Sequence, residues 1–420
     1  MSALTTPPPA TPWRNHAAQV AEVLDTDVPV LRAEEALVVA RALAGRFAPG
    51  AAARDADRRI PVTEYRELAA SGLLALTVPA EHGGPDLRVR TVTEVFRTLA
   101  EADPSLAQLP HSHYVYVNAL RHRGTPAQRR FFFDQVRAGR TFGNAQSEVG
   151  TRHVREHRTT LYPTPGGRWR LEGEKAYATG ALVSDWIPVL AHRDVDGPMH
   201  VAWVQRTATG VEVVDDWDGM GQRTTASGTV RLTGVDVAPE MLMEHGEIFA
   251  DGPQTYGAFA QVLHAAIDAG IARGALDEAA GFVTTRSRPH PDAGVTRHAD
   301  DPLVQHAFGE MELAVRAAEA LLAQAARAVD EADLDLTPQT AAAASLATAA
   351  ARAATSSAAV EVSSRLFEVA GTRASLHGLN LHRHWRNART HTLHDPAAWK
   401  VQHLGRHALD GTLPPAHGQL

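Results

Sequence analysis

The sequence predicts an α+β fold in which a helical region, a β-domain and a helical bundle follow one another along the chain. The hydrophobic pattern is helical from about residue 28 to 139, and it has a period of two from about 141 to 239. After residue 256, alanine-rich stretches with little glycine indicate long helices. We therefore expect a disordered tail at 1–25, an N-terminal helical domain at 26–140, a central β-domain at 141–245 and a C-terminal helical bundle at 246–420.

The N-terminal region contains one well-marked helix start. Thr125 is a good cap, Pro126 fits the first helical position, and Gln128 can complete a capping box. Gly139 is expected to end this helix, because glycine adopts the left-handed conformation that often follows a last turn.

The central region shows turn signals between short segments of alternating hydrophobicity. Glycine-containing turns are indicated at 166–167, 196–197 and 209–210. The segments between them predict strands of a small β-domain or barrel, at 168–172, 187–192, 200–205, 211–214 and 229–232.

Two long helices are expected in the C-terminal region. Asp301 and Thr337 each stand before a proline, as helix caps do. The stretches that they open, 302–331 and 338–370, are joined by a short loop, so the two helices should pack antiparallel in a bundle.

Composition restricts the possible functions. Of the 420 residues, 44% are hydrophobic and 21% charged, as in globular proteins with a sizeable core. The net charge of −7 favours neither nucleic acid nor an anionic membrane, and we expect no membrane span. The chain has no cysteine, which excludes disulfides, thiolate metal sites and thiol nucleophiles, and the histidines show no metal-binding spacing. A cytoplasmic enzyme without a metal is the natural interpretation.

The sequence lacks the glycine-rich phosphate loops of nucleotide-binding folds and the GxSxG nucleophile motif. Three polar clusters remain, at 142–148, 175–186 and 215–224, and tryptophans stand in two of them. Singly, these tryptophans could be core residues and the polar segments ordinary loops. Together they indicate the walls of a pocket for a flat aromatic cofactor.

The segment 382–400, HRHWRNARTHTLHDPAAWK, is dense in histidine and arginine, and Asp395 is its only carboxylate. Buried imidazole and guanidinium groups need partners, so packing alone explains this composition poorly. A solvated basic helix end remains the alternative for any one residue. We interpret the segment as part of a site, with Trp385 and Trp399 assigned to the core.

Six motifs identify a known family. VPAEHGG (78–84) matches a turn of the acyl-CoA dehydrogenase superfamily, and the order of the three regions matches its fold, which ends in a four-helix bundle. Within it, the chain resembles the two-component flavin monooxygenases related to dibenzothiophene monooxygenase and the sulfur-acquisition oxidoreductases. The motifs that carry this resemblance are FGNAQSE (142–148), GEKAYATGALVSDW (173–186), DWDGMGQRTTASGT (216–229), LFEVAGTRAS (366–375) and HWRNARTHTLHDP (384–396).

The resemblance implies an enzyme that uses reduced FMN, with FAD as the alternative, supplied by a separate NAD(P)H:flavin reductase. Oxygen adds at flavin C4a, and the hydroperoxide transfers one oxygen atom to a small sulfur-containing substrate such as a thioether, sulfone or thiophene. It further implies a homotetramer arranged as a dimer of dimers.

The resemblance also assigns roles to residues. His391 and His394 should lie over the reactive face of the flavin, with His113 across from them and His111 as its substitute; His264 is assigned to the structure. Asn144 and Ser147 should face the flavin, Tyr177 and Thr179 should line its ring, and Trp217 should pack near it, with Thr179 also counted among the catalytic residues. The phosphate should be held by Arg288, Gly371, Thr372 and Arg373, one set crossing a subunit interface.

Two departures affect the substrate pocket. The relative that acts on dibenzothiophene has a further asparagine where this chain has Val149, and it has serine in place of Thr179. The nature of the substrate is therefore left open by the sequence.

A chemical argument favours an oxygenase over a dehydrogenase. Removing an α-proton from an acyl-CoA thioester needs a carboxylate base, yet the C-terminal segment offers histidines and Asp395 alone, and residues 259–261 contain no carboxylate. Imidazoles suit a peroxyflavin, because they donate hydrogen bonds and protons without a nearby negative charge. The alternatives are an N-hydroxylase or aromatic hydroxylase of the same flavin class, an acyl-CoA dehydrogenase, and a non-catalytic protein that reuses the fold.

Overall fold

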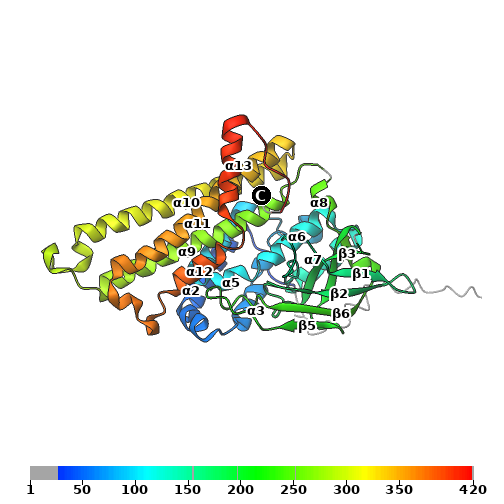
Figure 1. Cartoon of the computed structure of the whole chain (residues 1–420), viewed down its shortest axis with the longest axis horizontal. Helices are drawn as coiled ribbons and strands as arrows, with labels where there is room; N and C mark the ends of the chain where they lie inside the picture. The colour runs from blue at the N-terminus through cyan, green and yellow to red at the C-terminus, as the bar shows by residue number, and fades with distance from the viewer. Residues whose placement is uncertain (1–26, 154–155, 196, 251, 419–420) are drawn as a thin grey trace, which may run out of the picture.

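A computed structural model describes residues 27–153, 156–195, 197–250 and 252–418. The expected tail at 1–25 lies outside these residues. In Figure 1 the long helices of the C-terminal region lie side by side at one end of the molecule, and the β-sheet lies at the other, with N-terminal helices between them. The predicted order of helices, sheet and bundle is confirmed.

Among the described residues, six α-helices precede the sheet: α2 (Ala33–Asp57), α3 (Val62–Ala70), α4 (Val89–Ala102), α5 (Pro104–Gln108), α6 (His111–Arg123) and α7 (Pro126–Arg137). The predicted cap of α7 is confirmed, since the Gln128 N–H donates to the Thr125 hydroxyl at 3.2 Å and the Gln128 side chain accepts from the Thr125 N–H at 2.9 Å. The VPAEHGG motif forms a tight turn. A Cβ at Gly84 would stand 2.1 Å from the Val78 carbonyl oxygen, so only glycine fits there.

The sheet has seven strands in the order β5-β6-β2-β1-β3-β4-β7, antiparallel except for the β1–β3 pair. The five predicted strands are confirmed with small shifts in their ends. The prediction missed β1 and β7, which are short. The strands are β1 (Thr160–Pro163), β2 (Trp169–Lys175), β3 (Trp186–Arg193), β4 (Met199–Gln205), β5 (Val211–Val214), β6 (Thr229–Val237) and β7 (Leu242–Glu244).

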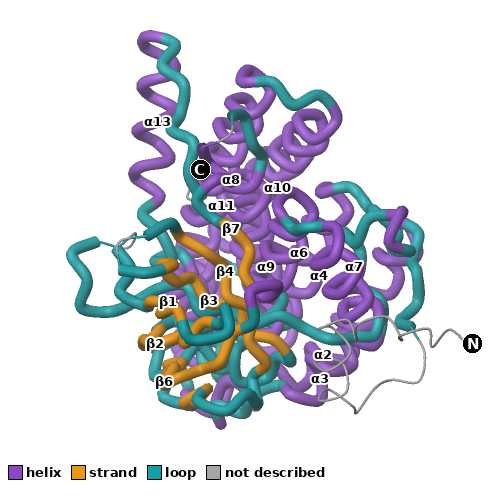
Figure 2. The backbone as a smooth tube through the Cα atoms, turned by 90° about the vertical axis from the view of Figure 1, so that its right-hand side faces the viewer, coloured by secondary structure: helices purple, strands orange, loops and turns teal. Residues whose placement is uncertain are grey.

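The C-terminal region contains α8 (Glu247–Ala250), α9 (Tyr256–Arg286), α10 (Pro302–Leu334), α11 (Pro338–Ala370), α12 (Arg383–His391) and α13 (Ala397–Asp410). An ion pair of 2.7 Å joins Arg365 near the end of α11 to Glu310 near the start of α10, which confirms the predicted antiparallel packing. The shorter α12 packs on α9 and α11 and completes a four-helix arrangement. Figure 2 shows α13 projecting from the body of the molecule.

The core has two parts. One is formed by the helices α2, α3, α4, α9, α10 and α11. The other lies between the sheet and helices α6 and α7, where Phe132 packs against Trp186 and Trp203. These two tryptophans are buried, whereas Trp399 on α13 is 61% exposed, so its assignment to the core was wrong. Its side chain faces outward because α13 projects from the bundle.

One described helix, α2, is long and apolar enough, by length and composition alone, to span a membrane, although we expected no such segment. In the fold, α2 packs on α4, and its Arg54 side chain is buried in an ion pair with Asp103. Its apolar residues Leu43 and Phe47 belong to the helical core.

Candidate active site

A buried ionic network joins the helices α9 and α11 at the centre of the bundle. The Asp268 carboxylate on α9 accepts hydrogen bonds from the Arg352 guanidinium and, at 2.9 Å, from the Ser356 hydroxyl, both on α11. Asp268 and Arg352 are at most 1% exposed. The protein interior solvates charges poorly, so a buried charge needs a partner, and here the Asp268 carboxylate and the Arg352 guanidinium neutralise each other.

His391 closes this network from the last position of α12. Its Nδ1–H donates to Asp268 Oδ1 at 2.5 Å. Its Nε2 lies 3.1 Å from His264 Nδ1 and 3.1 Å from Gln108 Oε1. The Nε2 atom of a neutral His391 can therefore accept a hydrogen bond from His264, and that of a protonated His391 can donate one to Gln108, so both protonation states find a partner.

Two further imidazoles pack around His264. The ring of His111 on α6 lies 3.8 Å from it, centroid to centroid, and the ring of His394 lies 4.0 Å away. His111 also donates from Nε2 to the Ala260 carbonyl at 2.9 Å. We call His111, His264, His391 and His394 the histidine cluster. The structure brings the two predicted histidines together and adds His264, which the sequence assigned to the structure alone.

The exposed end of the cluster is His394, whose side chain is 49% exposed. It lies 3.5 Å from the buried carboxylate of Asp395, which also pairs with Lys400 Nζ at 3.0 Å. The predicted segment therefore reaches from a buried imidazole to the surface within four residues.

Burial keeps the inner histidines neutral at pH 7. Desolvation lowers the pKa of His111 to about 3 and holds the pKa of His264 well below its ordinary value. Burial also raises the pKa of the Asp268 carboxyl, but attraction to His391 and Arg352 and the hydrogen bonds from His391 and Ser356 outweigh this, so its pKa is lowered and it stays ionised. The network thus holds one fixed anion beside neutral imidazoles.

A second polar group lies at the entry to the sheet. Asn144 Nδ2 donates to the Tyr177 carbonyl at 3.4 Å, whereas Asn144 Oδ1 is buried without a partner among the described residues. Tyr177 is 55% exposed, and its ring meets the Trp217 ring edge to face, with 6.2 Å between the ring centroids. The Thr179 hydroxyl pairs with Ser227 Oγ at 2.7 Å. All four residues were predicted to surround the cofactor.

The motifs FGNAQSE and GEKAY are tied together by groups that sequence reasoning missed. The Ser147 carbonyl accepts from the Ala176 N–H at 2.9 Å. Next to it, Glu148 Oε1 accepts from Lys175 Nζ at 2.8 Å, and neither side chain is more than 5% exposed. The pair fixes the loop that carries Asn144. The glutamate that ends the first motif and the lysine of the second were the available signal.

Helix α12 connects the polar loop of the β-domain to the bundle. Asn387 Oδ1 accepts from the Gln222 N–H at 2.7 Å, and Arg386 donates to the Met220 carbonyl at 2.7 Å. A Cβ at Gly221 would stand 1.9 Å from the Arg386 carbonyl oxygen, which explains this glycine. Asn387 lies one turn before His391 on the same face, so the loop that carries Trp217 and the histidine cluster are neighbours.

The predicted phosphate residues lie at the opposite end of the bundle. Arg373 donates to the Arg286 carbonyl at 3.1 Å, which brings the 371–373 turn beside the exposed Arg288. Arg286 lies 22 positions after His264 on α9, which is about 33 Å along the helix. Within one chain, these arginines are too far from the histidine cluster to bind the same mononucleotide.

His113 is placed differently from the other predicted histidines. It is fully buried, its Nε2–H donates to the Leu74 carbonyl at 2.8 Å, and its Nδ1 accepts from the Phe142 N–H at 3.1 Å. Both ring nitrogens are therefore used by the backbone, and the ring contacts Phe142 rather than the histidine cluster. The nearby alternative, His111, is the one that joins the cluster.

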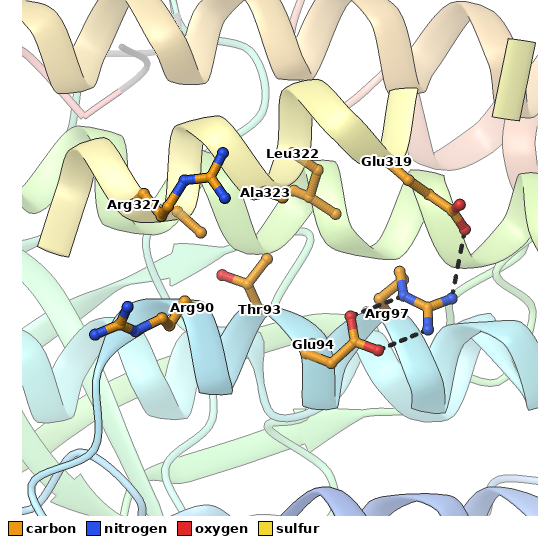
Figure 3. A pocket seen from close by; sticks show the side chains of 9 residues that line it. Arg90, Thr93, Glu94, Arg97, Glu319, Leu322, Ala323 and Arg327 are labelled. Carbon is orange, nitrogen blue, oxygen red and sulfur yellow. Dashed lines mark hydrogen bonds and ion pairs between the residues drawn. The ribbon is translucent and has the colours of Figure 1, made fainter. Parts of the chain in front are cut away.

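A groove of about 430 Å³ lies elsewhere, between α4 and α10. Figure 3 shows its mixed lining, in which Arg97 is paired with Glu94 at 2.7 Å and with Glu319 at 3.6 Å. Its charges are largely satisfied within the chain, so we do not assign the chemistry to it. In the described part of the chain, no group of histidine, aspartate and glutamate is arranged to hold a metal ion.

The residues around Asn144 fit a planar heterocycle with both donor and acceptor edges. Besides the unpartnered Asn144 Oδ1, both polar atoms of the Gln222 side chain are buried without partners among the described residues. Buried amide groups are normally hydrogen-bonded, so their orphan atoms mark a place for a polar ligand. The aromatic faces of Tyr177 and Trp217 suit a flat ring.

The chain is similar to proteins of one family over most of its length. Models of the N-terminal, middle and C-terminal domains of acyl-CoA dehydrogenase match residues 34–140, 141–235 and 262–398. Dibenzothiophene monooxygenase from Rhodococcus qingshengii is 32% identical, over 90% of this chain and 94% of that protein.

Two solved structures share the fold closely. FMN-bound TdsC from Paenibacillus sp. A11-2 is 33% identical with a TM-score of 0.87, covering 92% of this chain and all of that one. Methanesulfinate monooxygenase MsuC from Pseudomonas fluorescens is 31% identical with a TM-score of 0.84, covering 91% of this chain and 99% of that one. The chain belongs to the acyl-CoA dehydrogenase superfamily and, within it, to the flavin-dependent monooxygenases related to dibenzothiophene monooxygenase.

Proposed function

We propose that this protein is a reduced-FMN-dependent monooxygenase that transfers one oxygen atom of O2 to a small sulfur compound. The observation that carries the proposal is the histidine cluster. Asn387 holds it beside the loop that contains Gln222, and Asp268 binds His391 on its buried side. Relatives named for oxygenation of sulfur compounds, over nearly the whole chain, support the substrate class. In the balanced reaction the second oxygen atom leaves as water, and FMNH2 supplies two electrons.

The residues of this chain have distinct tasks in that reaction. Asn144 and Ser147 would hydrogen-bond the edge of the flavin ring, Tyr177 and Trp217 would pack on it, and Thr179 would line it. When bound, reduced FMN supplies the activation of O2. His391 then carries a proton at Nε2, because that atom has a partner in either protonation state. His394 joins this step at the solvent side of the cluster.

The contacts of the carboxylates near the histidine cluster argue against a dehydrogenase, because neither carboxylate is free to act as the catalytic base. Asp268 lies behind His391, a feature that the sequence argument missed, but it is held by Arg352 and His391. Asp395 is likewise paired with Lys400. A base that removes an α-proton must be free to approach the substrate. Both carboxylates are engaged by cations or imidazoles and kept from that task.

The proposal includes a second copy of the chain. Arg288 and the 371–373 turn lie near Arg286, about 33 Å along α9 from His264 of the histidine cluster. They would therefore bind the FMN phosphate of a neighbouring subunit. A homotetramer arranged as a dimer of dimers satisfies this requirement. A separate NAD(P)H:flavin reductase, with both proteins in the cytoplasm, would supply FMNH2.

The test is a reconstituted assay with an NADH:flavin reductase, FMN and a panel of thioethers, sulfinates, sulfones and thiophenes, followed by product mass. The proposal expects at least one sulfur compound to gain one oxygen atom per FMNH2 consumed. Oxygenation of amines or phenols alone would replace the sulfur assignment with N- or ring hydroxylation. Bleaching of bound oxidised flavin by an acyl-CoA under nitrogen would replace it with a dehydrogenase.

A further inference from the structure

The buried network behind His391 has a feature that packing does not require. Asp268 uses its two oxygen atoms for different partners: Oδ2 accepts from Arg352 and Ser356, and Oδ1 accepts from His391 Nδ1–H. Each oxygen therefore has a fixed role. The arrangement resembles the way a buried carboxylate orients a histidine in many catalytic sites, where it sets the position of the imidazole proton.

We infer that Asp268 is a positioning residue for the oxygenation reaction, in which its carboxylate keeps the proton of neutral His391 on Nδ1 and leaves Nε2 free to accept a proton. Arg352 and Ser356 act through Asp268 by holding it at the required angle. This inference rests on the proposed function for its catalytic consequence, but the position of the proton can be measured without turnover.

The tautomer follows from the hydrogen-bond inventory. An ionised carboxylate has only acceptors, so His391 must present N–H at Nδ1. Nε2 then carries the lone pair toward His264 and Gln108. Were the proton on Nε2 instead, two lone pairs would face each other across the 2.5 Å contact between Nδ1 and Asp268 Oδ1. That repulsion in a buried site fixes one tautomer.

The charged and titratable groups around the Asp268–His391 pair come from each helix or loop that packs against it. They are His111 on α6, His264 and Asp268 on α9, Arg352 on α11, His394 and Asp395 after α12, and Lys400 on α13. The carboxylates pair with Arg352 and Lys400, and the remaining groups are imidazoles. Removing the Asp268 charge alone therefore leaves the surroundings positive and disfavours protonation of His391.

The substitution Asp268→Asn makes a sharp prediction. Arg352 and Ser356 are donors, so the new amide must turn its oxygen toward them and its NH2 toward His391 Nδ1. The proton of His391 is then forced onto Nε2. The control is Asp103→Asn, because Asp103 is also a buried carboxylate, 5% exposed and paired with Arg54 at 2.8 Å, but the contacts of its side chain include no histidine.

The experiment is a proton NMR spectrum of the flavin-free protein in the far-downfield region, where a short His–carboxylate hydrogen bond gives a separate signal. The His384–Glu278 contact of 2.6 Å can give a second signal of this kind, so the His391 signal is assigned by its loss in His391→Gln. We expect the assigned signal in the wild type and in Asp103→Asn, and its loss in Asp268→Asn. Its absence from the wild type, or its survival in Asp268→Asn, would overturn the inference.

Activity provides the second readout. In Asp268→Asn, oxygenated product per FMNH2 consumed should fall about 10²-fold or more, with hydrogen peroxide in its place, and the pH profile of coupling should shift. If Asp268→Asn does not fold, the double variant Asp268→Asn/Arg352→Gln removes both buried charges and serves instead. A wild-type signal with no oxygenation of any substrate would refute the proposed function and leave the assignment of the proton intact. Unchanged coupling in either variant would refute the role of Asp268.

Discussion

The side-chain oxygen of Asn387 accepts a hydrogen bond from the backbone N–H of Gln222 at 2.7 Å, across the boundary between the bundle and the β-domain. Together with Arg386 and Gly221, it places the loop that carries Trp217 against the helix that ends in His391. The histidine-rich motif therefore has two structural roles. Its first half docks the β-domain, and its second half forms the histidine cluster.

Weakening this docking should separate the two halves of the site. Asn387→Ala leaves the buried Gln222 N–H without its acceptor, and we expect it to lower the free energy of unfolding by about 1–3 kcal/mol. Gly221→Ala must displace α12 and should cost at least as much. Urea unfolding of the flavin-free protein measures both. Arg389→Ala on the same helix is the control, and an equal loss there would show that the docking contact is not special.

Replacing His391 should uncouple oxygen use from product formation. In His391→Gln, FMNH2 oxidation should continue while oxygenated product falls by roughly 10²–10⁴-fold, the range for loss of a proton-transferring group. Hydrogen peroxide should account for the difference. His113→Gln is the matched control, because the backbone uses both His113 ring nitrogens, and we expect it to lower stability but not coupling. Full coupling in His391→Gln would remove this residue from the mechanism.

The distant arginines should affect cofactor affinity alone. Arg288→Ala and Arg373→Ala should each weaken FMN binding by about 10- to 100-fold, as loss of a charge-assisted hydrogen bond does. Quenching of FMN fluorescence measures this affinity. Arg297→Ala, which breaks an exposed pair with Asp300, should leave affinity unchanged. Equal affinity in all three variants would contradict a phosphate site shared between subunits.

Acid should loosen the loop that carries Asn144. Burial opposes ionisation of Glu148, but its hydrogen bond and attraction to Lys175 outweigh this and lower its pKa from 4.5 to about 2. A carboxylate with a depressed pKa stabilises the fold above its unfolded pKa, and this contribution disappears as the pH falls from 4.5 to about 2. Urea midpoints at pH 6, 4 and 3 should therefore fall more steeply in the wild type than in Glu148→Gln. Parallel pH dependence in the two proteins would count against the Glu148–Lys175 pair as an anchor.

The sequence predicted elements well where local rules decide them. The start of α11 and the cap of α7 are fixed by a threonine before a proline, and the structure has both. The strands β1 and β7 escaped prediction for a physical reason. They span four and three residues and are formed by pairing with β3 and β4, so their own residues hold little pattern.

The sequence predicted several residues of the candidate site but not the contacts between them. Motifs pointed to His391 and Asn144. Asp268 and Arg352 lie in long apolar helices, where a single charged residue is normally expected to face solvent. One signal was present: His264 and Asp268 are four residues apart and therefore share a face of α9. Whether that face is buried depends on α11 and α12, which the sequence alone does not place.

The measurement that tests the account most directly is turnover in ¹⁸O2 with reductase-generated FMNH2 and the best sulfur substrate, followed by product mass. We predict one ¹⁸O atom in each product molecule, with the other atom released as water, and a much smaller amount of labelled product in His391→Gln. A product that takes its oxygen from water, or substrate oxidation that proceeds without O2 and reduces the flavin, would contradict it.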